Sequence, residues 1–319
     1  MVELMIAMLV GLFLLGTLAL VLSNNSRTRN EMEKSIRQIQ NARYAIEVLT
    51  KDLSNAGFYG EAGLPITTSP LPQPCPAAGA LNGDVLAFPV QGADNLAAGP
   101  ACLPDLLPGT DYVVVRRAST CSVGQADCDP FVAGVPHIQQ PACTPGQTPL
   151  VSTALAALSG TTRQCIASQL APIYRLFNRV YYVAANNNAG DGIPTLMRAD
   201  LGGAGYGITP VAEGIQALHF EYGLDTDGDG EPDSYLLTNN SGALLAGGVA
   251  LPDAQWRDVV AIRVHLLARN VDPTAGYTDT RTYFLGQQTI APLNDAFKRQ
   301  AYSTTVRLNN VAGPRESSP

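Results

Sequence analysis

Lysine is nearly missing from this chain of 319 residues, in which it occurs only as Lys34, Lys51 and Lys298. Acidic residues outnumber basic ones by 27 to 20, and the formal net charge is -7. Nonspecific binding of nucleic acid depends on clustered Lys and Arg side chains that neutralise phosphates. General nucleic-acid binding is therefore not expected of this protein.

The sequence also lacks the familiar catalytic motifs. It contains no G-x-S-x-G, no H-E-x-x-H, no P-loop and no G-x-G-x-x-G after a strand pattern. His137 lies in a Pro-rich loop, whereas His219 and His265 alternate with apolar residues in strand patterns, which predicts exposed side chains. No catalytic residue is predicted, and an enzyme would need a site assembled from residues distant in the sequence.

The cysteines lie in one region rich in proline and glycine, and none of them forms a C-x-x-C pair. Disulfides are favoured over a zinc site because only His137 lies among these cysteines. Disulfides would place this part of the chain in an oxidising compartment. Many pairings are possible, and sequence proximity favours only Cys121–Cys128. The disulfide candidates are Cys75, Cys102, Cys121, Cys128, Cys143 and Cys165.

The opening segment, "MVELMIAMLVGLFLLGTLALVLSNN", places a carboxylate, Glu3, before a long apolar run. No charged side chain occurs from Leu4 to Leu22, a length close to the ~20 residues of a membrane-spanning helix. Basic residues follow the run and none precedes it, which is the reverse of the usual pattern for a chain whose body lies outside the cytoplasm. We therefore expect a short basic leader upstream of Met1. A cleaved signal peptide is the alternative, although no clear A-x-A site follows the run.

An amphipathic stripe continues beyond the apolar run. Its members recur every three or four residues, as on one buried face of a helix: Met32, Ile36, Ile39, Ala42, Ile46, Leu49, Leu53 and Ala56. No proline occurs from Val2 to Ser54, so the sequence predicts one helix of ~53 residues and ~80 Å that ends at Gly57 and Gly60. The expected divisions are the transmembrane half of this helix, 1–23, its amphipathic continuation, 24–56, and a globular head, 57–319.

The head has two stretches of different composition. Residues 61–170 are rich in Pro, Gly, Ala and Cys, with strand patterns at "DVLAFPV" and "DYVVVRRA". Residues 171–319 carry cleaner strand patterns bounded by turn residues, namely "IYRLFNRVYYV", "PTLMRA", "GIQALHFEY", "DVVAIRVHLLAR", "RTYFLG" and "FKRQAYSTTVRL".

Alternation assigns the faces of two of these strands. It directs Val260, Ile262, Val264, Leu266, Leu218, Phe220 and Tyr222 toward the core, and Arg263, His265 and His219 to the other side. The predicted fold class is α+β, with a long N-terminal helix packed on antiparallel β-sheet and a loop-rich, disulfide-bearing insertion.

The densest polar cluster is "DTDGDGEPD", which lies between two strand patterns. Asp225, Asp227 and Asp229 recur at every second position, and Asp233 follows. Carboxylates at this spacing suit Ca²⁺, which takes ~6–8 oxygen ligands, although Leu236 stands where an EF-hand would have its closing glutamate. A solvated acidic turn is the alternative. Because four aspartates would repel one another without a cation, we expect a structural Ca²⁺ bound by all four.

Several stretches resemble one family. "MVELMIAMLVGLFLL" resembles the start of type IV pilins, and "LTKDLSNAGFYG", "PTLMRA", "VAEGIQALHFEYGLDTDGDGEPDSY", "WRDVVAIRVHLLAR" and "FKRQAYSTTVRLNN" resemble PilW-type minor pilins. The resemblance covers the helix and the C-terminal half, and it covers the cysteine-bearing region poorly. It implies a pilin-like fold, no enzymatic activity, and a single-pass protein of the bacterial inner membrane with a periplasmic head that later enters a surface pilus.

The resemblance also implies partners and one assembly residue. A prepilin peptidase would trim the leader, and other minor pilins and the major pilin would contact the chain in a priming or tip complex. Glu3 matches the family's near-terminal glutamate, which can pair with the terminal amine of a neighbouring subunit in a water-poor filament core. For Glu3, the alternative is a contact with the positive end of its own helix dipole. For the chain, the alternatives are a type II secretion pseudopilin, a membrane-anchored periplasmic enzyme, or a tip adhesin that uses the loops of Cys75 to Cys165.

Overall fold

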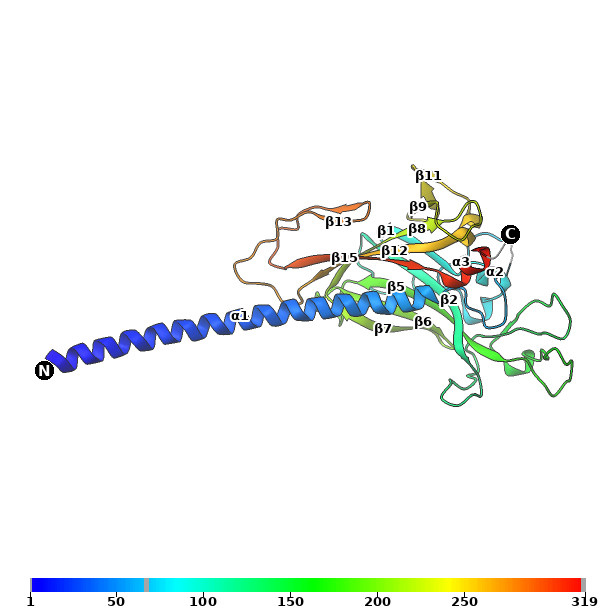
Figure 1. Cartoon of the computed structure of the whole chain (residues 1–319), viewed down its shortest axis with the longest axis horizontal. Helices are drawn as coiled ribbons and strands as arrows, with labels where there is room; N and C mark the ends of the chain where they lie inside the picture. Colours follow the sequence, from blue (N-terminus) through cyan, green and yellow to red (C-terminus); the bar gives the residue numbers. More distant parts are fainter. Residues whose placement is uncertain (1, 66–68, 317–319) are drawn as a thin grey trace.

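The long helix predicted from the sequence is present. The computed structural model describes residues 2–65 and 69–316, and α1 spans Val2–Ser54. Gly57 and Gly60 follow it with φ angles of 77° and 71°, which glycine adopts without steric cost, so the helix ends where it was expected to end. Figure 1 shows that only the second half of α1 lies on the head, while the first half runs out as a free rod.

Two antiparallel sheets and a small hairpin form the head in the part of the chain that the structure describes. The first sheet has the order β1-β2-β5-β3-β4, with β6 on β5 and β7 on β6. Its strands are β1 (Val90–Leu96), β2 (Thr110–Ser122), β3 (His137–Gln139), β4 (Leu150–Ser152), β5 (Ile173–Ala184), β6 (Thr195–Gly202) and β7 (Gly205–Glu213).

The second sheet has the order β11-β10-β9-β8-β12-β15. Its strands are β8 (Ile215–Leu224), β9 (Ser234–Thr238), β10 (Leu244–Ala246), β11 (Val249–Ala250), β12 (Val259–Arg269) and β15 (Arg299–Arg307). The hairpin is β13 (Tyr283–Leu285) with β14 (Gln288–Ile290), and the short helices are η1 (Ala78–Ala80), α2 (Gly83–Leu86), η2 (Leu155–Ala157), η3 (Asp253–Asp258) and α3 (Asn309–Glu316). The predicted α+β class, a long helix on antiparallel sheet, is confirmed.

The main core lies where α1 meets both sheets. Ala42, Ala45, Leu49 and Leu53 of the helix share one buried cluster with inward side chains of β2, β5, β8 and β12. Val260, Ile262, Val264, Leu266, Leu218, Phe220 and Tyr222 are all buried, as the alternation predicted. Burial of these apolar side chains supplies the main favourable free energy that holds helix and sheets together.

The predicted helical stripe is wrong at its first two positions. Met32 and Ile36 are 60% and 50% exposed, whereas the polar residues Gln38 and Asp52 are buried. The apolar pattern identifies an apolar side of the helix. It does not predict how much of the helix length the head covers. The head covers the side that carries Gln38, Ala42 and Leu49, and the first two apolar residues of the stripe lie off that side.

Two further sequence predictions are corrected. Residues 84–86, the first three of "DVLAFPV", belong to α2 instead of a strand, because the Asn82 side chain accepts a hydrogen bond from the Val85 N–H at 3.1 Å and caps the turn. His219 and His265 are 3% and 7% exposed, although they were expected on an open face. The turn of the β13–β14 hairpin covers His265, since a Cβ on Gly286 would lie 2.7 Å from His265 Nε2, and His219 lies against Asp111 of β2.

The loops between β2 and β5 project at the end of the head opposite to the N-terminus (Figure 1), whereas Cys75 and Cys102 pack against a buried cluster of the first sheet that includes Val114 and Val180. The cysteines form three disulfides, Cys75–Cys102, Cys121–Cys128 and Cys143–Cys165. The expected disulfides are confirmed, and the pair favoured by proximity is among them. Each closes a loop, which restricts the unfolded chain more than the folded one.

Candidate functional site: the N-terminal helix and the acidic loop

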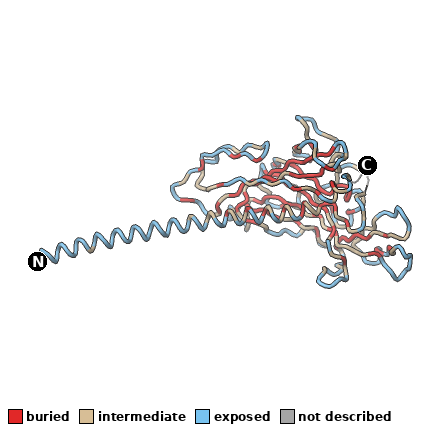
Figure 2. The backbone as a smooth tube through the Cα atoms, in the orientation of Figure 1, coloured by how far each residue is buried: buried red, intermediate tan, exposed pale blue. Residues whose placement is uncertain are grey.

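The first half of α1 is bare. Every residue from Val2 to Asn30 is exposed except Gly11, which is half-buried, and Figure 2 shows the change from exposed to buried where the helix reaches the head. This half is long and apolar enough to cross a membrane, and none of its most apolar stretch is buried. An apolar surface of this size marks a site of contact with lipid or with other proteins.

Glu3 lies in the first turn of this bare half. No described residue pairs with its carboxylate, and the next charged residue along the helix is Arg27. In this position the carboxylate complements the exposed N–H groups of the helix start. It also lies beside an apolar surface, so it would need a cationic partner if that surface were enclosed.

The packed half of α1 ends on a buried carboxylate that sequence reasoning did not identify. Asp52 is 4% exposed and accepts hydrogen bonds from Arg117 Nη2 at 2.8 Å, Arg179 Nη1 at 2.8 Å and the Tyr181 hydroxyl at 2.5 Å. Burial alone would raise its pKa, but the adjacent Arg179 and Arg117 guanidiniums lower it below its usual value. The available signal was a charged residue three positions after Leu49, on the buried side of the helix.

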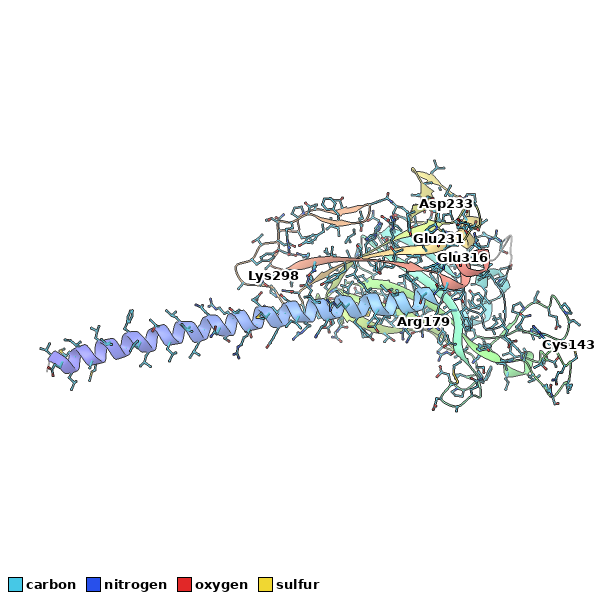
Figure 3. All side chains as sticks on the ribbon, viewed as in Figure 1. Cys143, Arg179, Glu231, Asp233, Lys298 and Glu316 are labelled. Atoms are coloured by element: carbon cyan, nitrogen blue, oxygen red, sulfur yellow. A yellow bond between two sulfur atoms is a disulfide. The ribbon has the colours of Figure 1, made fainter. Side chains whose placement is uncertain are left out.

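Arginines extend this contact across the sheet. Arg117, Arg175 and Arg179 lie 4.9, 5.0 and 4.3 Å from the centre of the Phe177 ring, within range of cation–π attraction. Asp200 of β6 accepts a hydrogen bond from Arg179 Nε at 2.6 Å, so the Arg179 guanidinium contacts a second carboxylate besides that of Asp52. Figure 3 labels Arg179 beside the end of α1. The end of the helix is therefore fixed to β2, β5 and, through Arg179, β6.

A second polar contact lies where the packed half of α1 begins, and we call it the Glu31 clamp. Glu31 Oε2 accepts hydrogen bonds from Lys298 Nζ at 2.9 Å and Thr274 Oγ1 at 2.8 Å. Lys34 Nζ donates to Glu31 Oε1 at 3.1 Å and to the Pro273 carbonyl at 2.8 Å. The Lys298 hydrogen bond, with that of Thr274, lowers the pKa of Glu31 to about 2. Sequence reasoning missed this contact as well.

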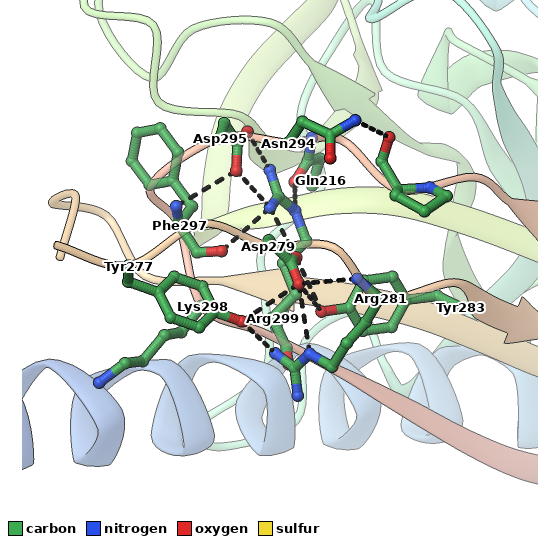
Figure 4. A network of polar contacts seen from close by, with 12 residues as sticks. Gln216, Tyr277, Asp279, Arg281, Tyr283, Asn294, Asp295, Phe297, Lys298 and Arg299 are labelled. Atoms are coloured by element: carbon green, nitrogen blue, oxygen red, sulfur yellow. Dashed lines mark hydrogen bonds and ion pairs between the residues drawn. The ribbon is translucent and has the colours of Figure 1, made fainter.

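The loop that supplies Lys298 and Thr274 is held by a buried ion network, drawn in Figure 4. Arg299 Nη1 lies 2.9 Å from Asp279 Oδ2, and Arg299 Nη2 lies 2.5 Å from Asp295 Oδ2. Arg299 Nε donates to Gln216 Oε1 at 2.6 Å, and the Tyr283 hydroxyl donates to Asp279 Oδ2 at 2.8 Å. Burial alone would raise the pKa of Asp279, but hydrogen bonds from Tyr283 and Arg299 lower it. Paired and hydrogen-bonded charges of this kind make a stiff support.

The acidic loop joins β8 to β9. Asp225, Asp227 and Asp229 each present a carboxylate oxygen, and these oxygens lie within 4.8 Å of one another. Asp233 is directed elsewhere, because its Oδ2 accepts hydrogen bonds from the Thr226 N–H at 2.7 Å and hydroxyl at 2.5 Å. The structure thus brings together three of the four aspartates predicted to bind Ca²⁺.

Asp225 already has partners of its own. It accepts from the N–H groups of Gly228 at 2.6 Å and Gly230 at 3.0 Å, and from Arg315 Nη1 of α3 at 3.1 Å. Burial alone would raise its pKa, but these donors lower it. Hard carboxylate oxygens fit Ca²⁺, and a bound ion would share Asp225 with Arg315 or displace it.

His137, expected in a loop, begins β3 and is buried, and the other two buried strand histidines, His219 and His265, also have structural partners. Asp111 Oδ2 of β2 lies 2.9 Å from His219 Nδ1 and accepts from the Phe220 N–H at 3.0 Å. His265 Nδ1 lies 2.7 Å from the Ser303 hydroxyl on the neighbouring strand. Burial alone would lower the pKa of His219, but its bond to Asp111 raises it. The Asp111 carboxylate therefore ties the first sheet to the second.

Comparison with known proteins identifies a family for the second half of the chain. Residues 180–310 match the family model of the Type IV Pilus-assembly protein W. A comparison with curated proteins gave no match. A solved type IV-like pilin from Thermus thermophilus is 14% identical, with 86% of this chain and 98% of that chain covered and a TM-score of 0.40. The family match contains β8, the acidic loop and β12, and it confirms the recognition of a PilW-type pilin. Residues 180–310 of the chain are thus similar to the type IV pilus-assembly protein W family.

Proposed function

We propose that this protein is a minor pilin that takes part in type IV pilus assembly, in a priming or tip complex with other minor pilins. The observation that carries the proposal is the PilW match over residues 180–310 on a head from which a bare apolar helix projects. The protein would be anchored once in the bacterial inner membrane, with a periplasmic head, and processed by a prepilin peptidase. It would act by assembly and not by catalysis.

The bare half of α1 would serve in two surroundings. A bilayer core needs ~20 apolar residues in a helix, and Val2 to Leu22 supplies that length. The same surface can afterwards be covered by the helices of the major pilin and of other minor pilins, which are as apolar as lipid tails. Transfer from lipid to filament then leaves the free energy of apolar burial nearly unchanged.

Within such a filament Glu3 would pair with the terminal amine of a neighbouring subunit. A carboxylate enclosed by apolar side chains is costly without a cation, so correct pairing would favour one axial register. Glu3→Gln should reduce recovery of the chain in sheared pili and leave its amount in membranes unchanged. Glu33→Gln is the matched control, since Glu33 is exposed beyond the apolar run. Equal recovery of both variants would contradict the pairing.

Mass spectrometry of pili sheared from native cells tests the proposed function directly. The chain and its N-terminal peptide should be found in the filament fraction, at a low level relative to the major pilin. Its presence in membranes alone would contradict a pilin. Its recovery from a secretion filament would select the type II pseudopilin instead.

We further propose that Asp225, Asp227 and Asp229 bind a structural Ca²⁺. Calorimetric titration of the full chain in detergent should show heat of binding, and the melting temperature should rise because the ion binds the folded state. Asp227→Asn should abolish both effects, and Asp272→Asn, at an exposed aspartate outside the loop, should abolish neither. Arg315→Gln should tighten binding because it removes the cation that contacts Asp225. The absence of both binding heat and a rise in melting temperature would contradict Ca²⁺ binding by these aspartates.

A tip adhesin is a second candidate, favoured by one observation. The loop closed by Cys143–Cys165 lies at the end of the head farthest from the N-terminus, where Figure 3 labels Cys143, and at a filament tip it would face outward. Deletion of residues 144–164 between Cys143 and Cys165 should then reduce attachment of cells and leave the number of pili unchanged. A variant that attaches as well as the native chain would exclude this candidate.

A further inference from the structure

The Glu31 clamp is unusual in composition and in place. Lysine occurs at three positions in the chain, and two of these lysines, Lys34 and Lys298, converge on one carboxylate. Glu31 is also the point at which α1 first becomes half-buried after the exposed stretch of 12–30. The clamp therefore lies at the junction between the free helix and the head.

The head side of the clamp is rigid. Thr274 N–H donates to the Ala296 carbonyl at 2.8 Å, and Asn270 N–H donates to the Lys298 carbonyl at 3.0 Å, so the two segments of the loop are joined across its base. The buried pair of Arg299 with Asp279 adjoins them. Lys298 and Thr274 are thus presented to Glu31 from a fixed support.

A second contact lies two turns farther along the helix. Gln38 is buried, and its Nε2 donates to the Ala268 carbonyl at 2.7 Å. Two contacts about 10 Å apart on one helix define a direction, and the ~29 residues before Glu31 extend it by ~43 Å. Rotation of ~10° at the clamp would move the helix tip by ~7 Å.

We propose that Glu31 is a positioning residue that, through Lys298 and Thr274, fixes the direction in which the free half of α1 leaves the head. The proposal rests on the proposed function in one respect, because that direction decides how the head sits once the free half is packed in a membrane or filament. A half-exposed ion pair contributes little to global stability. Its loss should therefore change the direction of the helix much more than the melting temperature.

The test measures direction in the full chain. Spin labels at Ser23→Cys on the free half and Ala301→Cys on β15 report the distance from helix to head by pulsed electron spectroscopy in detergent micelles. Both positions are exposed, and the native cysteines are held in disulfides. Glu31→Ala should roughly double the width of the distance distribution with little change in melting temperature.

Two variants serve as controls. Glu33→Ala makes the same substitution at an exposed position on the same turn and should leave the distribution narrow. Lys298→Arg keeps a cation opposite Glu31 and above the Tyr277 ring, from which Lys298 Nζ lies 5.9 Å, and should also leave it narrow. An unchanged width in Glu31→Ala, or an equal widening in Glu33→Ala, would overturn the proposal.

The outcome is separable from that of the proposed function. Absence of the native chain from sheared pili would contradict the proposal that it is a minor pilin. The spectroscopic distances would still test whether Glu31 fixes the direction of the helix. If both proposals hold, Glu31→Ala should enter pili several-fold less than Glu33→Ala at equal amounts in the membrane.

Discussion

The two halves of α1 share one unbroken backbone and differ in everything that surrounds it. Val2 to Asn30 is bare, whereas Glu31 to Ser54 is held at both ends by buried or half-buried carboxylates and between them by Ala42, Ala45 and Leu49. Helices in proteins gain most of their stability from packing. The comparison therefore shows that the sequence of the bare half is suited to surroundings that its own head does not supply.

Asp52→Asn is expected to have the largest effect on this comparison. The substitution removes the negative charge that pairs with Arg117 and Arg179 at the end of the packed half. Both guanidiniums then lose their ion pair with residue 52. Breaking a buried pair in this way costs ~3–5 kcal/mol of unfolding free energy. Urea unfolding of the full chain in detergent measures the loss. Glu47→Gln, on the exposed side of the same helix, is the control and should cost less than ~0.5 kcal/mol.

The same substitution made once in each half gives a direct contrast. Leu49 is fully buried, so Leu49→Ala should lower the free energy of unfolding by about 2–4 kcal/mol through lost burial and a cavity. Leu14 is exposed on the bare half, and Leu14→Ala should change the unfolding of the head by less than ~0.5 kcal/mol. Equal losses would mean that the bare half packs on the head in solution.

The features that the sequence predicted are local ones. The helix follows from an uninterrupted run without proline, and the inward residues of β12 follow from alternation along a single strand. Features set by distant segments were missed. His219 is buried through Asp111, which lies 108 positions away, and Asp52 meets Arg179 at a separation of 127. Strand β7 carries Pro210, which is tolerated because, among the described strands, β7 pairs with β6 alone and is an edge strand.

The acidic loop was predicted in part. Its composition predicted the cluster of Asp225, Asp227 and Asp229, because neighbours in a tight turn stay close in space. The orientation of Asp233 away from the cluster was not predicted. It depends on the path of the turn, where Gly228 and Gly230 have φ angles of 85° and 86°. That path allows the Asp233 carboxylate to accept from Thr226 instead.

Acid should loosen the junction between the two halves. The pKa of Glu31 is about 2 with the clamp formed and 4.5 ordinarily, so the clamp gains stability from ionised Glu31 above pH 4.5 and loses it as the pH falls toward 2. The distance distribution between residues 23 and 301 should therefore broaden over that range in the native chain. In Glu31→Ala the width should not depend on pH there, and a parallel broadening of both would assign the effect to another group.

The smallest expected effect concerns the outer side of the packed half. Met32, Ile36 and Tyr44 point away from the head and stay largely exposed, so they extend the apolar surface of the bare half alongside the head. Ile36→Ser should change the free energy of unfolding by less than ~0.5 kcal/mol because this side chain is 50% exposed. Under the proposed function it should still reduce recovery in sheared pili, since neighbouring helices would lie against this side. Unchanged stability with full recovery would confine the assembly surface to the bare half, whereas a loss above ~1 kcal/mol would show that the head itself covers Ile36.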